Sequence, residues 1–385
     1  MRVLSLFDGM ACGALALQKA GIPIDEYNAF EIDKYAIQTS SHNFPFIKHH
    51  GDVFDADFSQ FKGCDILIGG SPCTYWSIAQ KNNRETEASG IGWDLFSQYV
   101  RALKEAEPKY FIYENNKSMA KAIKDSISEA FGFEPIMINS ALVSAQNRQR
   151  LYWVGRRNFR GGYDKVDVKL PEDKGILLRD ILESGTADKQ KAYCLKHQAG
   201  NARDYFKKHH TQVAFEPIAI NSTNDGKAQT IKSQYSKNGF SNFFRYCSTY
   251  GATGVAEPVR IGDIGSVAQA HRVYSCDGKS VSVGTNSGGQ GGSTGLYFCP
   301  VGSDDMRIPI YEIKNGKLTH NGKQYSVKLD DGLYIIRKLT VKECMRLQTV
   351  PETYEFPVSN TQAYKMLGNG FTINTIAHIL SFIKG

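Results

Sequence analysis

The sequence predicts an α/β protein with a doubly wound, Rossmann-like sheet and a smaller, loop-rich second domain. In the first 155 residues, apolar segments of strand length alternate with segments of helical period. After about residue 160 the segments become short and irregular, and residues 251–302 contain 12 of the 36 glycines. Regular patterns return near residue 336. We therefore expect one discontinuous domain, 1–160 plus 336–385, and a second domain at 161–335.

Apolar periodicity and helix punctuation place the individual elements. Apolar runs predict strands at 3–7, 28–32, 65–70 and 110–113. Helical spacing predicts helices at 14–20, 34–43 and 95–106. Asp33 can cap the second helix, and Pro108 closes the third. Because strands and helices alternate, the strands should be parallel, with helices on both faces of the sheet.

The C-terminal segment has the regularity of the first domain. Thr340 and Glu343 form a capping-box pattern that opens a helix ending before Pro351. A last helix carries apolar residues on one face, at Ile373, Ile376, Ala377 and Leu380. We expect these helices to pack back on the first domain.

Composition indicates a globular protein without membrane spans. The chain is 41% hydrophobic and 22% charged, and no apolar run approaches the roughly 20 residues of a membrane span. No signal-peptide pattern is visible at the N-terminus. None of the eight cysteines forms a C-x-x-C pair, so neither a metal site nor a disulfide framework is expected. The net charge of +7 is compatible with a polyanionic partner but does not identify one.

A turn between the first strand and the first helix predicts a ligand site. It consists of Phe7-Asp8-Gly9 followed by Gly13. Glu31, at the end of the second strand, can accept hydrogen bonds from ribose hydroxyls, and Asp52 can bind an adenine amino group. The turn lacks G-x-G-x-x-G, which favours an adenosine cofactor without phosphates. A nicotinamide enzyme, or an ordinary turn with surface acids, is the alternative.

A cysteine follows the strand at 65–70, in the segment GGSPC. Cys73 therefore lies at the carboxyl end of a sheet strand, where ligand sites of α/β proteins occur. Pro72 restricts the backbone, and the polar segment 74–92, with Trp76, Lys81 and Arg84, resembles a closing loop. This is the setting of a nucleophile, whereas a buried structural cysteine is the alternative.

Two polar segments complete the set. Glu114 follows the strand at 110–113 and should lie at the same sheet edge as Cys73. In QNRQR, an extended chain places Gln146, Arg148 and Arg150 on one face, which suits a phosphate or a carbonyl oxygen. A surface carboxylate and a solvated edge strand are the respective alternatives.

Together these motifs resemble the DNA (cytosine-5)-methyltransferase family. In the family's order, and outside about 160–335, the matching segments are LSLFDGMACG, FEID, GDV, GGSPC, ENN, QNRQR, RKLTVKECMRLQTVPETY and MLGNG. The resemblance implies methyl transfer from S-adenosylmethionine to carbon 5 of a flipped-out cytosine in double-stranded DNA. Two residues depart from the family pattern, since Asn116 replaces the usual valine and Gly370 the usual serine.

The resemblance also implies the site residues. Cys73 is the expected nucleophile, Glu114 and Arg150 are expected on the target base, and Arg148 is expected nearby. The implied S-adenosylmethionine site comprises Phe7, Asp8, Gly9, Gly13, Glu31, Ile32, Asp52, Val53, Pro72, Leu95 and Asn369. Residues 161–335 correspond to the target recognition domain. We expect a monomer in the cytoplasm of a bacterial or phage-infected cell.

Other functions are compatible with parts of this pattern. A tRNA cytosine methyltransferase shares the chemistry, although the long glycine-rich module favours duplex DNA. An adenine methyltransferase would need a Pro-Pro-aromatic motif, which is absent. An inactive DNA-binding scaffold would not need to keep Cys73, Glu114 and both arginines. The recognised DNA site, and a restriction-modification, phage or orphan role, are not specified by the sequence.

Overall fold

The computed structural model describes residues 1–77, 84–195, 206, 213–218, 260–263, 272–275, 296–298, 310–320 and 322–383. The chain divides into two compact units. The first comprises Met1–Ile181, Lys191–Ala199 and Thr340–Gly385, and the second comprises Leu182–Gln190 and Gly200–Leu339. The first unit therefore extends beyond residue 160, because β9 (Tyr163–Lys165) pairs with β8 (Gln149–Arg157) in its sheet.

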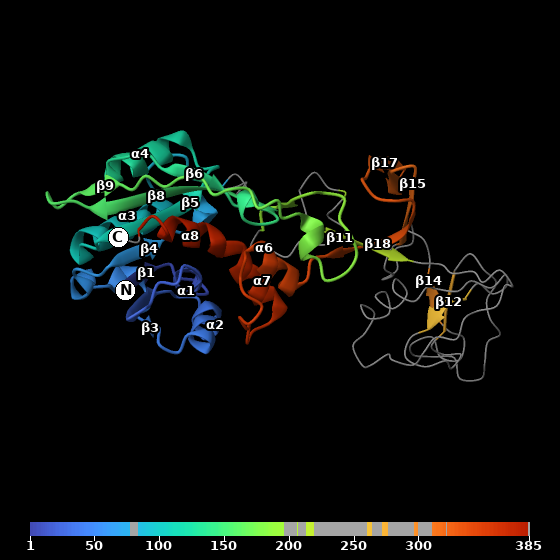
Figure 1. Cartoon of the computed structure of the whole chain (residues 1–385), viewed down its shortest axis with the longest axis horizontal. Helices are drawn as coiled ribbons and strands as arrows, with labels where there is room; N and C mark the ends of the chain where they lie inside the picture. Colours follow the sequence, from blue (N-terminus) through green and yellow to red (C-terminus); the bar gives the residue numbers. More distant parts are fainter. Residues whose placement is uncertain are drawn as a thin grey trace. The chain divides into compact units, whose positions relative to one another are not determined.

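An eight-stranded sheet forms the centre of the first unit (Figure 1). Its order is β3-β2-β1-β4-β5-β8-β6, with β9 beside β8. The other strands are β1 (Arg2–Leu6), β2 (Glu26–Phe30), β3 (Lys48–His49), β4 (Ile66–Gly69), β5 (Tyr110–Asn116) and β6 (Ile136–Asn139). The strand order reverses between β1 and β4, so the carboxyl ends of these strands form the topological switch point where ligands bind.

The predicted doubly wound sheet is confirmed for the first five strands, which are parallel. The sheet is mixed, however, because β8 runs antiparallel to both β5 and β6. The apolar run in LYWV predicts a strand but carries no information on its direction. As a result of this arrangement, Arg150 on β8 lies opposite Asn116 on β5.

Helices cover both faces of this sheet. On one face, α3 (Ile91–Ala106) and α4 (Lys121–Phe131) bury an aromatic-rich core that includes Phe96, Tyr99, Phe111, Phe131 and Trp153. On the other face lies α1 (Cys12–Lys19), where a Cβ on Gly13 would be 2.6 Å from the Tyr27 hydroxyl. The remaining N-terminal helix, α2 (Lys34–Asn43), is capped by Asp33, as predicted.

Several element boundaries differ from the predicted ones. The second strand ends at Phe30, so Glu31 lies in the turn after the strand. Asp52 was expected where a third strand ends, but that strand is only Lys48–His49, and Asp52 caps a 3-10 turn, η1 (Val53–Asp55). Glu114 lies within β5 and does not follow it. The last two differences arise because hydrogen bonds to neighbouring strands, and not apolar side chains alone, determine where a strand ends.

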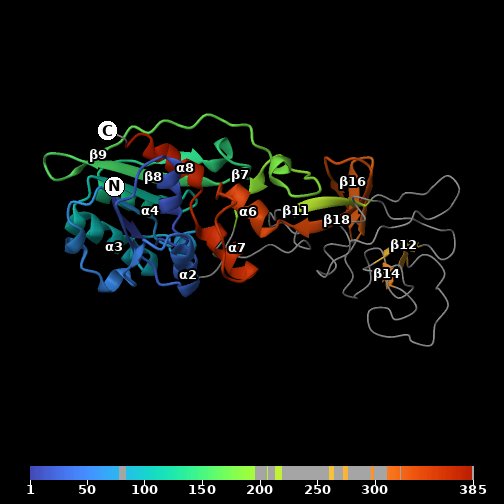
Figure 2. The same ribbon diagram turned by 60° about the horizontal axis from the view of Figure 1, so that its bottom comes forward.

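The C-terminal helices pack back on the first unit, as predicted. They are α6 (Val341–Leu347), α7 (Asn360–Asn369) and α8 (Ile373–Leu380), and Figures 1 and 2 both show α8 near the sheet. The capping box is confirmed, since Glu343 N donates to the Thr340 hydroxyl at 3.1 Å and Thr340 N to the Glu343 carboxylate at 2.8 Å. Buried hydrogen bonds also join Ser140 to Thr372 at 3.0 Å.

The described residues of the second unit form two small sheets. The larger is antiparallel, in the order β11 (Val213–Ile218), β18 (Gly332–Lys338), β15 (Ile310–Lys314), β16 (Lys317–His320) and β17 (Lys323–Ser326). The smaller contains β12 (Arg260–Asp263), β13 (Arg272–Ser275) and β14 (Leu296–Phe298). The glycine-rich stretch 284–295 lies outside the described residues. Across the described parts of both units, no helix is long and apolar enough to span a membrane.

Candidate active site

The turn after β1 has an unusual backbone conformation. Phe7, Gly9 and Ala11 all adopt the left-handed region, with φ of 56°, 60° and 60°. This conformation costs free energy for Phe and Ala, so surrounding contacts must impose it. One such contact is the hydrogen bond from Gly9 N to Glu31 Oε2 at 2.8 Å. The turn and the end of β2 are therefore held as one structure.

Glu31 is fixed by three backbone donors. Besides Gly9 N, its carboxylate accepts from Ile32 N and Asp33 N, each at 2.8 Å. A carboxylate has about four acceptor positions, so capacity remains for a ligand hydroxyl. Ile32 beside it is 72% exposed. A fixed acceptor next to an exposed apolar side chain is the combination that a ribose and its attached base require.

Asp8 adds a buried carboxylate to the same turn. Its Oδ1 accepts from the Ser5 hydroxyl and the Tyr27 hydroxyl, both at 2.6 Å. Its Oδ2 is buried without a hydrogen-bond partner in the described structure. Burial, reinforced by the charge of Glu31 and opposed by the Ser5 and Tyr27 hydrogen bonds, raises the pKa of Asp8 to about 6. An acid-rich turn suits a cationic ligand and disfavours a pyrophosphate.

The other predicted cofactor residues occupy varied positions. Gly13 packs α1 against Tyr27, and Val53 is buried, its carbonyl accepting from Arg101 at 2.7 Å. Asp52 is half-buried and accepts from Phe54 N at 3.0 Å. Leu95 is half-buried against the aromatic core, whereas Pro72 is exposed. Of the predicted cofactor residues, Gly9 and Ile32 are linked through the Glu31 carboxylate, and Phe7 lies in the same turn as Gly9.

The loop after β4 presses directly against β5. A Cβ on Gly70 would lie 2.5 Å from the backbone oxygen of Glu114, so only glycine allows this approach. The Ser71 hydroxyl lies 2.7 Å from the Tyr113 hydroxyl, and Asn115 donates to Ser71 O at 3.2 Å. The backbone of Cys73, which begins the 3-10 turn η3 (Cys73–Tyr75), is therefore at the same sheet edge as Glu114.

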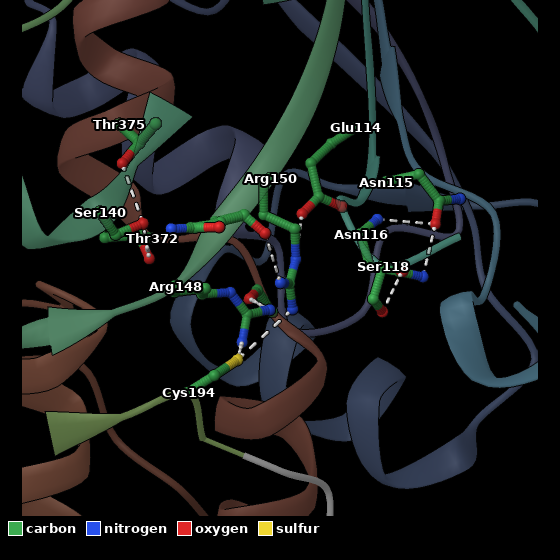
Figure 3. A network of polar contacts seen from close by, with 12 residues as sticks. Glu114, Asn115, Asn116, Ser118, Ser140, Arg148, Arg150, Cys194, Thr372 and Thr375 are labelled. Atoms are coloured by element: carbon green, nitrogen blue, oxygen red, sulfur yellow. Dashed lines mark hydrogen bonds and ion pairs between the residues drawn. The ribbon is translucent and has the colours of Figure 1, made fainter. Parts of the chain in front are cut away.

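Glu114 and Arg150 form a shielded ion pair. Arg150 Nε donates to Glu114 Oε1 at 2.8 Å, and the two side chains are 12% and 11% exposed. Figure 3 shows the two side chains pointing toward each other from β8 and β5. The family resemblance implied that both residues contact the target base, and the antiparallel pairing of β5 with β8 brings them together.

Arg148 is buried, at 3% exposure, and its donors are used within the protein. Its guanidinium donates to Gly368 O at 3.1 Å and Gly370 O at 2.9 Å. Gln146, Arg148 and Arg150 do share one face, because each contacts the segment at Cys194 and Leu195. The sequence predicted a phosphate or a carbonyl oxygen as the partner of the arginines, and Arg148 donates to three backbone carbonyls, those of Leu195, Gly368 and Gly370.

Cys194 is the component of the site that the sequence did not predict. Its sulfur lies 3.4 Å from Arg148 Nη1 and 3.6 Å from Arg150 Nη2. The residue is 46 positions from Arg148 in the chain and lies in none of the recognised motifs, so no spacing signal could have identified it.

Comparison with known proteins decides the family. A family model for C-5 cytosine-specific DNA methylases matches residues 1–385. The chain belongs to this family. The activity of the family, methylation of DNA cytosine at carbon 5, is accordingly the activity of this methyltransferase. The predicted resemblance is confirmed over the whole chain.

Curated relatives match at similar length. The orphan methyltransferase M.SPRI of Bacillus phage SPR is 26% identical, covering 98% of this chain and 96% of the relative. The type II methyltransferase M.HhaI of Haemophilus parahaemolyticus is 24% identical, covering 98% and 93%. Among solved structures, a DNMT2 variant of Spodoptera frugiperda matches with a TM-score of 0.55 and 13% identity, covering 100% of this chain and 99% of that chain. This last likeness concerns the fold.

The two departures from the family pattern have local explanations in this methyltransferase. A Cβ on Gly370 would lie 2.8 Å from Cys12 Sγ, so the cysteine occupies the space that a serine would need. Asn116 is buried, donates to Asn115 Oδ1 at 3.2 Å and accepts from the Ser118 hydroxyl at 2.8 Å. At both positions, therefore, the residue fits the side chains that surround it in this chain. Asn369, beside Gly370, is exposed at the end of α7.

The predicted closing loop at 74–92 is described at its two ends, 74–77 and 84–92. Trp76 is fully buried in the core below α3, and its indole N–H donates to Glu85 at 3.0 Å. Arg84 donates to Ser118 O at 2.7 Å. These two side chains therefore anchor the ends of the segment to the first unit. Lys81 lies outside the described residues.

Proposed function

We propose that this methyltransferase transfers a methyl group from S-adenosylmethionine to a flipped-out cytosine within a specific duplex DNA sequence, with Cys73 as nucleophile. The shielded Glu114–Arg150 pair beside the GGSPC loop carries the proposal. The pair offers both a carboxyl and a guanidinium to one edge of a base, which suits the ring nitrogen and carbonyl oxygen of cytosine.

The chemistry requires a thiolate because carbon 5 of cytosine is a poor nucleophile. Addition of Cys73 at carbon 6 makes carbon 5 electron-rich enough to attack a methyl group. Protonation of, or hydrogen bonding to, ring nitrogen 3 withdraws electrons and assists this addition, and this role falls to Glu114. Arg150 binds the carbonyl oxygen. After transfer, a base removes the proton at carbon 5, and the Cys73 thiolate leaves.

S-adenosylmethionine supplies an electrophilic methyl group on a cationic sulfonium. The acids of the β1 and β2 ends favour a cation, whereas they disfavour the pyrophosphate of a nicotinamide dinucleotide. Phe7 and Gly9 would hold the cofactor at the turn, Glu31 would accept from its ribose, and Ile32 would contact its adenine. Asp52 and Asn369 would complete the site, with Asp52 accepting from the adenine amino group.

The named relatives support the choice of DNA and of a specific sequence, since they are an orphan phage enzyme and a type II enzyme. We further propose that the protein acts as a monomer in the cytoplasm of a bacterial or phage-infected cell. The second unit would be the target recognition domain.

Replacement of the nucleophile tests this proposal. Cys73→Ser should abolish methyl transfer because a hydroxyl is far less nucleophilic at neutral pH, while S-adenosylmethionine affinity stays within about twofold. DNA containing 5-fluorocytosine should form a denaturation-resistant adduct with the wild type, and mass spectrometry should place it on Cys73. Cys64→Ser, which removes a buried thiol at the opposite end of β4, is the matched control and should retain both reactions. An adduct on Cys12, Cys64 or Cys194 would refute the assignment.

A further inference from the structure

The sulfur of Cys194 contacts two arginines, one on the side of the proposed target-base site and the other on the side of the proposed cofactor site. Arg150, 3.6 Å from the sulfur, is paired with Glu114 on the target-base side. Arg148, 3.4 Å from it, binds the carbonyls of Gly368 and Gly370, which flank the proposed cofactor residue Asn369. Figure 3 shows dashed lines from the sulfur to both guanidinium groups. One atom thus contacts both arginines.

The Cys194 sulfur acts as a hydrogen-bond acceptor for two positively charged side chains. Two guanidinium groups that approach the same point repel each other unless an acceptor lies between them. Burial alone would raise the pKa of the Cys194 thiol, but the charges and N–H groups of Arg148 and Arg150 outweigh it, and the net pKa is lowered. Leu195 O also accepts from the thiol at 3.5 Å. Among the described residues, Glu114, Tyr152 and Cys12 are further titratable groups that interact with these arginines.

The backbone of Cys194 is held firmly in place. The preceding strand β10 (Ala192–Tyr193) pairs with β7 (Gln146–Asn147), and Ala192 N donates to Ala145 O at 2.7 Å. On the other side, Leu195 N donates to Gln146 Oε1 at 2.7 Å. A rigid support of this kind is what a precise site requires of its supporting residues. The sulfur position is therefore determined by the same QNRQR segment that carries the arginines.

We propose that Cys194 is a positioning residue for methyl transfer. Its sulfur holds the Arg150 guanidinium against Glu114 and couples it to Arg148, so that the base-binding pair keeps its orientation before the cytosine enters. The proposal rests on the proposed role of Arg150 at the target base. No covalent step falls to Cys194.

Two variants of Cys194 test the proposal against a purely structural role. Cys194→Ala removes the acceptor and should lower kcat about tenfold, the effect of losing a hydrogen bond to a charged group. The KM for S-adenosylmethionine should change less than about twofold, since the cofactor-side carbonyls still hold Arg148. Cys194→Ser restores an acceptor and should recover part of kcat. The pKa of the Cys194 thiol is lowered by the two arginines whereas a serine hydroxyl does not ionise, so the pH profile of kcat in Cys194→Ser should differ from that of the wild type.

The controls separate this proposal from the proposed function. Cys64→Ser again reports the effect of removing a buried thiol elsewhere, and thermal unfolding is measured for every variant. Full kcat in Cys194→Ala would overturn the positioning role, as would an equal loss in both variants with an unchanged pH profile. Activity in Cys73→Ser would instead overturn the proposed function itself, whatever the Cys194 variants show.

Discussion

Asp8 and Arg148 are both buried and charged, but their hydrogen bonding differs. The Arg148 guanidinium has carbonyl and sulfur acceptors around it. Asp8 has two donors on one oxygen and an unpaired second oxygen. A buried, half-satisfied carboxylate destabilises the folded state when it is ionised. Asp8 should therefore make the stability of the first unit depend on pH.

The sign of this dependence follows from the two pKa values. The pKa of Asp8 is about 6 in the folded protein, against about 3.9 in an unfolded chain. The folded state therefore binds the proton more tightly. Stability from this group is fully present below about pH 4 and is lost as pH rises through about 6, by up to about 3 kcal/mol.

Asp8→Asn should remove this dependence, because the amide keeps an acceptor for Ser5 and Tyr27 but does not ionise. Relative to wild type, the variant should become progressively more stable between about pH 4 and 6. Denaturant unfolding across this range measures the difference. The exposed Asp167→Asn serves as control and should follow the wild-type curve. A difference between Asp8→Asn and wild type that does not change with pH would contradict the expectation.

Also at the residue scale, the sequence predicted site residues that are recognisable by their chemistry. It missed those whose role depends only on their position in the folded structure. Cys73, Glu114 and Glu31 are reactive or charged residues that follow apolar runs, and this pattern is visible in the sequence. Cys194 is placed by the pairing of β10 with β7, a contact between distant segments. The left-handed conformation of Phe7 and Ala11 was equally hidden, because neither residue type favours it.

At the scale of elements, apolar periodicity and capping patterns predicted β1, β2, β4 and β5 and the helices α1, α2, α3, α6 and α8 to within a few residues, but they predicted neither α4 nor β6. They did not predict the antiparallel direction of β8 or the extension of β5 through Asn116. Both features decide the site, since they bring Arg150 to Glu114. Direction and pairing depend on hydrogen bonds to other strands, which periodicity within one segment cannot report.

The contact between the β4 loop and β5 leads to a prediction at this scale. In Gly70→Ala the new Cβ would lie 2.5 Å from Glu114 O and 3.2 Å from Glu114 Oε2, so the loop or β5 must shift. Displacement of Glu114 from Arg150 should lower kcat at least about tenfold, because small misplacements in a site are costly. S-adenosylmethionine affinity should stay within about twofold, since the residues around Glu31 are untouched.

Gly162→Ala is the matched control. Its Cβ would make only ordinary contacts, the nearest at 3.6 Å to Asn158, so activity should be retained. Steady-state kinetics with calorimetric titration of S-adenosylmethionine separates the two effects. Wild-type kcat in Gly70→Ala would show that the loop does not set the position of Glu114.

At the scale of the whole molecule, the predicted chemical residues are confined to the first unit. Every proposed catalytic and cofactor residue, and Cys194, falls within Met1–Ile181, Lys191–Ala199 or Thr340–Gly385. The second unit contributes short strands and the glycine-rich stretch, whose composition suggested close approach to a ligand backbone. This separation supports a division of labour in which the second unit selects the DNA sequence.

Exchange of the second unit tests that division. Residues 200–339, the larger part of the second unit, would be replaced by the corresponding segment of M.HhaI, while 161–199 are kept, because 161–181 and 191–199 belong to the first unit and include Cys194. Bisulfite sequencing of DNA from expressing cells should show methylation at the sequence that M.HhaI recognises. The same chimera carrying Cys73→Ser should give no methylation, which assigns the signal to this catalytic unit. An active chimera that keeps the original sequence preference would place specificity in the first unit, and the segment after Cys73 would then be the next region to exchange.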